Sequence, residues 1–295
     1  MIGAALSEGI NCRYLTMNGP IAQMAALTCY INAQRRGLSS GGFYPGNSTF
    51  QHCEYVWFGT PKWSLFSREQ KWKIVANTPQ EWMDNVVGGS FDRAILDYQP
   101  SNDPGTSDRM SAGFVGGGGR WRICLERKGR ANCWEARWTV GDRNASDNRI
   151  WRVMYGLKEE NAIPPPPIRT LETLALELKE LLESVEEVAR RRKLTSFADQ
   201  FVLAQSCLVS QDPLSMVYHR DLTTLDVVGI DGARMLAACQ ACWVFGGMGS
   251  WNDMGFDGEE QREYEELSGH LFSACKDGIC AAVNRSGPQN NTVTI

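Results

Sequence analysis

The segment Phe245–Glu260 combines five glycines, one tryptophan and several carboxylates, and we expect it to contact a partner. Glycines let a backbone approach a neighbour closely, and Trp251 beside Asn252 and Asp253 offers an apolar anchor next to polar groups. The alternative is packing, in which the glycines end one helix, Trp251 fills the end of a helical bundle and Asp257 caps the next helix. The carboxylates do not have the spacing of a calcium loop.

Tryptophans interleaved with cations form the second candidate site. Trp134 and Trp138 alternate with Glu135 and Arg137, so the two indoles share one face of a strand. Aromatic rings among cations suit protein contacts and could also stack bases or sugars. The alternative is that the tryptophans pack against helices while the arginines face water. Eight of the ten tryptophans lie in the first half: Trp57, Trp63, Trp72, Trp82, Trp121, Trp134, Trp138 and Trp151.

Three motifs with possible chemistry fail when their context is considered. Cys239 and Cys242 have the spacing of a redox or zinc pair, but zinc normally takes four ligands and the chain has no second such pair. His219–Leu222 matches the start of a kinase catalytic loop, yet Asp226 replaces the metal-binding Asn. A strand pattern follows Gly116–Gly119, where a phosphate loop needs a helix N-terminus. We therefore predict no catalytic residues, no metal and no cofactor.

Alternation of apolar and polar residues predicts a sheet in the first half of the chain. Arg120–Arg127, Cys133–Val140 and Arg149–Tyr155 follow this period and are joined by short turns, as in an antiparallel meander. Start and stop signals predict further elements, which are strands at Cys53–Phe58 and Phe91–Tyr98 and helices at Pro20–Arg36 and Thr78–Val87.

Beyond this region the apolar period changes from two to 3.6. The run Pro164–Pro167 cannot join a helix or a central strand, and it predicts a stiff linker. Leucines and valines then form one stripe along Leu171–Val188, with most glutamates outside it, as in an amphipathic helix. Three more helices are predicted, with starts near Ser196, Asp231 and Asp257. Four helices with apolar stripes indicate a bundle.

The predicted fold class is α+β, with an N-terminal antiparallel-sheet region followed by an all-α bundle of about four helices. Residues 1–163 carry 19 Lys/Arg and 15 Asp/Glu, or +4, whereas residues 164–295 carry 11 and 19, or −8. This difference in charge supports a boundary at the prolines. The predicted organisation is a Trp-rich α+β domain at 1–163, a proline linker at 164–167, an acidic helical bundle at 168–284 and a disordered tail at 285–295.

Composition limits the setting and the partner. The chain has no run of about 18 apolar residues and no signal-peptide pattern near its start, so we predict a cytoplasmic protein without a membrane segment. Most of the ten cysteines should then be buried free thiols. The net charge of −4 makes nucleic acid an unfavourable partner.

The leading hypothesis is a non-enzymatic protein-binding or regulatory module, of the adaptor or toxin-neutralising type. Its contacts would be Trp251 and the tryptophans of the meander. The alternative is a hydrolase or transferase with a site in the cleft between the two regions, where the loop Trp251–Glu260 supplies carboxylates. The cations of that site would be Arg120, Arg122 or Arg137.

Overall fold

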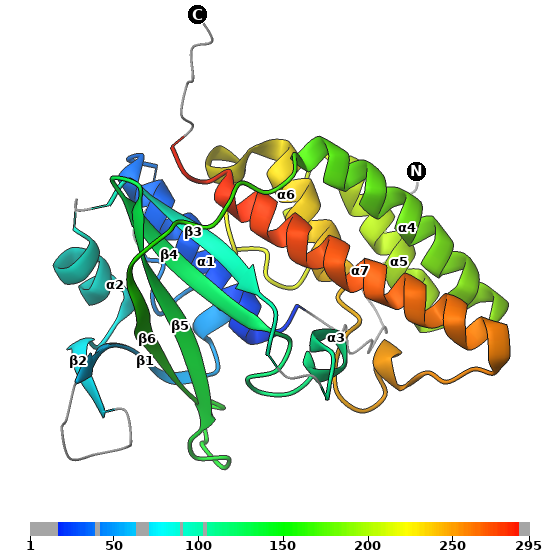
Figure 1. Ribbon diagram of the computed structural model, residues 1–295, viewed down its shortest axis with the longest axis horizontal. Coiled ribbons are helices and arrows are strands. Elements are labelled where there is room, and N and C mark those ends of the chain that lie inside the picture. Colours follow the sequence, from blue (N-terminus) through cyan, green and yellow to red (C-terminus); the bar gives the residue numbers. More distant parts are fainter. Residues whose placement is uncertain (1–16, 39–41, 63–70, 89–90, 103–104, 289–295) are drawn as a thin grey trace, which may run out of the picture.

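The computed structural model describes residues 17–38, 42–62, 71–88, 91–102 and 105–288. A six-stranded sheet in the first half is followed by a region of four helices, which is the predicted α+β class (Figure 1). The strand order is β2-β1-β6-β5-β4-β3. The strands are β1 (Cys53–Lys62), β2 (Lys71–Ala76), β3 (Arg93–Gln99), β4 (Arg120–Arg127), β5 (Arg130–Val140) and β6 (Trp151–Ala162).

The predicted meander β4-β5-β6 is present. Lys128 and Gly129 connect β4 to β5 and both have positive φ, the backbone of a two-residue hairpin turn. The prediction of an antiparallel sheet is correct for four pairings and wrong for one, because β1 runs parallel to β6. Between these strands the chain forms β2, β3, β4 and β5, so the local alternation of β1 carries no information on its direction relative to β6.

Helix α1 (Gly19–Arg35) lies against one face of the sheet (Figure 1). Its buried side chains surround the helix, because α1 contacts the sheet on one side and α6 and α7 on the other. Even the polar side chain of Gln23 is buried, and it accepts a hydrogen bond from the Tyr155 hydroxyl at 3.0 Å. The remaining helices of the first half are short: α2 (Pro79–Trp82), which continues as a π-helical turn (Met83–Val87), and α3 (Asp108–Ser111).

The second half is a bundle in which α4 contacts α5 and α7, and α6 contacts the same two helices. Two predicted helix starts are wrong in detail. Leu194, not Ser196, occupies the N-cap of α5, and α6 begins before Asp231 and is interrupted at Gly229, whose φ is 72°. Asp257 occupies the N-cap of α7 without a side-chain cap bond. The helices are α4 (Leu171–Arg191), α5 (Thr195–Val209), α6 (Leu225–Ala241) and α7 (Gly258–Asn284).

Two asparagines connect the helices to the free edge of β3. Asn32 of α1 accepts from the amide of Ala94 at 2.8 Å and donates to its carbonyl at 2.9 Å. Asn284 of α7 accepts from the amide of Leu96 at 2.7 Å and donates to its carbonyl at 3.0 Å. Each asparagine side chain forms the two hydrogen bonds that a neighbouring strand would form. Together they cover an edge that would otherwise expose unpaired backbone groups.

The sheet and the bundle share one hydrophobic core, although an extended segment containing Pro164–Pro167 separates them in sequence. The core continues past the predicted end of the bundle. Ser286, which the sequence places in a disordered tail, is fully buried and accepts a hydrogen bond from Asn32 at 2.8 Å. That boundary is corrected at Ser286, and residues 289–295 lie outside the described part of the chain. None of the helices in the described ranges is long and apolar enough to cross a membrane.

Candidate functional site

The sheet divides into two arms at one end. β4 remains paired with β3 as far as Arg120, opposite Gln99, and β5 remains paired with β6 as far as Val140. Pairing between β4 and β5, in contrast, ends at Arg122, which lies opposite Glu135. Two neighbouring strands therefore diverge beyond this pair, as Figure 1 shows. The divergence opens a cleft between the arms.

The cleft has a volume of about 760 Å³, within the range of ligand-binding pockets. The N-terminus of α1, the diverging strands, β6, one residue of β2 and the loop before β4 form its walls. Among the residues that the structure describes, the lining brings together three indoles, three cations and a single carboxylate, which are Trp72, Trp121, Trp138, Arg120, Arg137, Lys158 and Glu135. The combination suits a ligand with negative charge and apolar groups.

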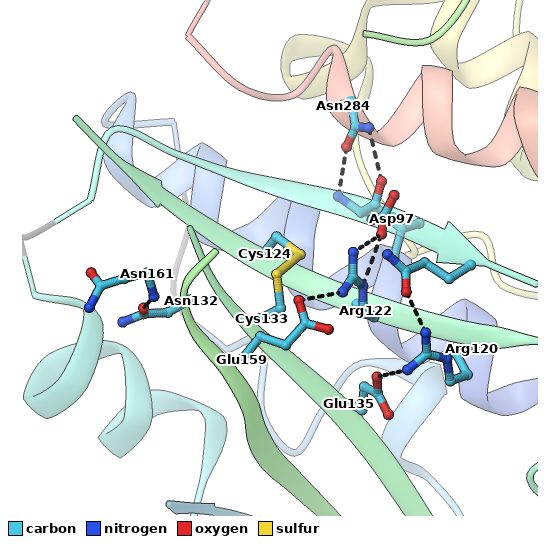
Figure 2. The surroundings of a disulfide bond; sticks show 12 residues. Asp97, Arg120, Arg122, Cys124, Asn132, Cys133, Glu135, Glu159, Asn161 and Asn284 are labelled. Atoms are coloured by element: carbon cyan, nitrogen blue, oxygen red, sulfur yellow. Dashed lines mark hydrogen bonds and ion pairs between the residues drawn. A yellow bond between two sulfur atoms is a disulfide. The ribbon is translucent and has the colours of Figure 1, made fainter. Parts of the chain in front are cut away.

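The charged side chains that line the cleft neutralise one another only in part. Arg120 forms an ion pair with Glu135 at 3.6 Å, so the one carboxylate among the described lining residues already has a partner (Figure 2). Arg137 is exposed and forms no ion pair with the residues that the structure describes. The Lys158 ammonium lies 4.9 Å from the ring centre of Trp72, a cation–π contact that leaves its charge uncompensated. The cleft therefore has a positive surface.

Trp72 is positioned by a glycine on the neighbouring part of the sheet. A Cβ atom on Gly156 would lie 2.5 Å from the Trp72 ring, so the indole can lie flat on β6 only because that residue has no side chain. The ring thereby becomes one wall of the cleft. An alternation pattern in the sequence could not identify this pair, because Trp72 and Gly156 are 84 residues apart.

The glycine run before β4 borders the cleft and has a packing role. Gly119 has a φ of 82°, and a Cβ atom there would lie 2.4 Å from the Tyr98 ring. The Tyr98 hydroxyl donates to Asp108, and burial together with that hydrogen bond raises the pKa of Tyr98. Strand β4 follows the glycines directly, as predicted, so these glycines do not lead into a helix N-terminus.

Arg122 does not line the cleft. It is buried, and it forms ion pairs with Asp97 at 2.5 Å and with Glu159 at 2.9 Å (Figure 2). Next to it, Cys124 of β4 and Cys133 of β5 lie directly opposite one another and form a disulfide. Strands β4 and β5 are thus fixed together on one side of the Arg122–Glu135 pair and diverge on the other.

Trp251 is part of the core. It has no exposed surface, its rings contact Phe197, Phe201 and Tyr264, and its indole nitrogen donates to Ser268 at 2.8 Å. This arrangement is the packing alternative that the sequence allowed. The side chain is therefore not available on the surface as a contact for a partner.

The polar neighbours of Trp251 fix the loop that contains it. Asn252 accepts from the Arg109 guanidinium at 2.9 Å and donates to the Arg109 carbonyl at 2.8 Å. Asp253 accepts a hydrogen bond from the amide of Gly249 within the same loop, and Asp257 begins α7. None of these carboxylates is among the described residues that line the cleft. The structure does not bring them together with Arg120 and Arg137.

The predicted strand face of Trp134 and Trp138 is only partly buried. Trp134 is almost completely inaccessible and packs against Trp82 and Phe58. Trp138 is half-buried, contacts Trp151 and lines the cleft. The structure therefore assigns packing to the first tryptophan and leaves the second accessible to a ligand.

An exposed apolar patch lies near the cleft. The backbones of Gly113 and Gly246 touch, since a Cβ atom on Gly113 would lie 2.1 Å from the carbonyl carbon of Gly246. The two glycine-rich loops that meet here carry large exposed apolar side chains, with Met248 fully exposed and Phe114 exposed to 65%. We define the patch by Met110, Phe114, Val115 and Met248. Sequence reasoning selected Trp251 in the second loop and not Met248, because periodicity does not reveal which large side chain of a loop points outward.

Ser48, His219 and Asp221 form a cluster with the residue types of a catalytic triad. The Ser48 hydroxyl lies 2.8 Å from Nδ1 of His219 and donates to Asp221, and the Ser48 amide donates to the same carboxylate at 2.6 Å. In a catalytic triad the carboxylate would instead contact the other histidine nitrogen. Burial lowers the pKa of His219 to about 4. The cluster joins a loop of the first half to the bundle.

All seven free cysteines in the described ranges are buried and therefore excluded from solvent. Cys242 and Cys275 approach to 3.4 Å in the bundle core, near Cys239. Hydrogen bonds with neighbouring thiols, together with burial, raise the pKa of Cys242 and Cys275 well above the ordinary value. Among the described residues, no group of three His, Cys, Asp or Glu side chains has the arrangement of a metal site.

Comparison of the chain with protein-family models, with curated proteins and with solved structures finds no match.

Proposed function

We propose that the protein is a non-enzymatic binding module of the adaptor or toxin-neutralising type, and that its partner is another protein. The observation that carries the proposal is the cleft between the two arms of the sheet, with its positive and aromatic lining, next to the apolar patch. Protein interfaces combine aromatic and arginine contacts with an apolar centre. The partner would place acidic side chains in the cleft and an apolar side chain on the patch.

The alternative function, a hydrolase or transferase, has weaker support from this geometry. Acid–base catalysis uses titratable groups that converge on one point with suitable pKa values. The described part of the cleft lining contributes three cations and one carboxylate, and that carboxylate is paired with Arg120. A second pocket, of about 280 Å³ between α1 and the loop 221–227, includes Asp221 in its lining but neither Ser48 nor His219.

A cytoplasmic location belongs to the same proposal. Seven free buried cysteines in the described ranges support a reducing compartment. The single disulfide, Cys124–Cys133, is enclosed in the sheet, where Ile95 and Ala131 complete a small apolar cluster with it. Nucleic acid remains an unfavourable partner, because many arginines of the first half are paired with carboxylates.

The test is affinity capture from the native host with the wild-type chain and with a double variant of the patch, Phe114→Ser with Met248→Ser. The matched control is Leu176→Ser with Val209→Ser, which removes two exposed apolar side chains from the bundle surface. We expect one partner to be lost with the patch variant and kept with the control. Equal capture by all three proteins, with unchanged thermal unfolding, would contradict the proposal.

A further inference from the structure

The edge of β5 that faces the cleft differs from the outer edge of β3. β5 continues for five residues beyond Glu135, as Ala136–Val140, and these pair with β6 on one side only. In an antiparallel strand, alternate residues direct their amide and carbonyl groups away from the existing partner. In the part of the chain that the structure describes, no backbone or side-chain hydrogen bond occupies these outward groups.

This uncovered edge stands in contrast to β3. There, Asn32 and Asn284 satisfy the outward backbone groups of Ala94 and Leu96 with paired hydrogen bonds. Natural sheets usually protect free edges, because such edges pair readily with other chains. The sheet thus protects its edge at β3 and leaves an inner edge free at β5, at the point where it opens a cleft of about 760 Å³.

We propose that the partner enters the cleft as an extended acidic segment, which adds to β5 as a further strand. This inference rests on the proposed function and specifies how the partner is held. Main-chain hydrogen bonds to Ala136–Val140 would supply affinity, and side chains that alternate between the two faces of the added strand would supply specificity.

The two faces of the cleft predict the sequence pattern of that segment. Arg137 and Arg120 lie on the same face of the sheet as Glu135, because Arg122 and Glu135 are direct partners and the side-chain period is two. Trp138 and Trp121 lie on the opposite face, toward α1. An added strand would therefore meet cations with every second side chain and indoles with the others. Its sequence should alternate acidic and apolar residues.

The experiment uses the full chain and a blocked seven-residue peptide with Glu at odd positions and Val at even positions. Binding is measured by calorimetry and compared with a peptide in which Lys replaces Glu. Two further peptides carry N-methyl groups on every Glu or on every Val, so that each blocks the amides of one edge of the strand. We expect the Lys peptide, and one of the two methylated peptides, to bind at least about tenfold more weakly than the parent.

Variants of the protein identify the site. Arg137→Glu should weaken binding of the Glu–Val peptide by about tenfold or more, whereas Arg143→Glu, an equal charge change at an exposed position of the β5–β6 turn, should leave it unchanged. If both methylated peptides bind as tightly as the parent, strand addition is overturned while charge-dependent binding remains. If the parent peptide does not bind, the acidic strand is overturned, and the capture experiment still decides the proposed function independently.

Discussion

His219 should make the protein lose stability in mild acid. Its ring is buried, its backbone amide donates to Gln240 at 3.3 Å, and its Nδ1 atom contacts the Ser48 hydroxyl. That hydroxyl donates its proton to Asp221, so the neutral ring donates from Nδ1 to the hydroxyl oxygen. Burial lowers the pKa of His219 to about 4 from the ordinary 6.5, against the opposing effect of Asp221. Protonation of the ring is therefore unfavourable in the folded state.

The magnitude follows from proton linkage. Between pH 6.5 and pH 4 the unfolded chain binds a proton at His219 that the folded chain does not bind, so the free energy of unfolding falls as the pH falls. The contribution of His219 to the free energy of unfolding is fully present above pH 6.5. Below about pH 4 this contribution falls no further. With these values, the loss between pH 7.5 and pH 5.0 is about 2 kcal/mol, and the total is about 3 kcal/mol.

The assay is urea unfolding followed by tryptophan fluorescence at a series of pH values. His219→Asn keeps a side-chain amide near Ser48 and removes the titrating ring, so its stability should fall by about 2 kcal/mol less than that of the wild type over this interval. His270→Asn, on the exposed surface of α7, is the matched control and should behave like the wild type. Equal losses in the wild type and in His219→Asn would refute the assignment.

Three further variants test other parts of the structure. Trp251→Ala should cost about 3–5 kcal/mol in urea unfolding, because it empties a fully enclosed site, and a loss below about 1 kcal/mol would show that the indole is on the surface. Asn284→Ala should cost about 1–3 kcal/mol and speed hydrogen exchange at the Leu96 amide, and unchanged exchange there would contradict the edge contact. Gly156→Ala should displace Trp72 and weaken the Glu–Val peptide severalfold without lowering the urea midpoint; unaltered affinity would remove Trp72 from the site.

The locally periodic elements were predictable from the sequence. The stripe of α4, the alternation of β4 and β5, and the extended segment at Pro164–Pro167 all occur where the sequence places them. Each depends on residues within a few positions of one another, and this range is what periodicity reports. The same reasoning selected the loop around Trp251, because unusual composition is also a local property.

The candidate site was predictable only in part. Trp138 was selected as a binding residue and Arg120 and Arg137 as cations of the alternative enzyme site, and these three line the cleft. Trp134 and Arg122, selected with them, are buried and do not line it. Trp72 was not selected, because its place depends on contact with the distant Gly156. The apolar patch was missed as well, since it exists only where two glycine-rich loops from different halves of the chain touch.

The amino-acid sequence by itself determined the α+β class, the change of period at the prolines and the positions of the long helices and of the meander strands, because neighbouring residues decide backbone conformation and one buried face. Only the tertiary structure decided that β1 lies parallel to β6, that β4 and β5 diverge beyond Arg122 and Glu135, and that Trp251 is enclosed. The reason is that these features depend on which distant segments meet. The packing of the sheet against α1 and α7 settles that, and no local pattern encodes it.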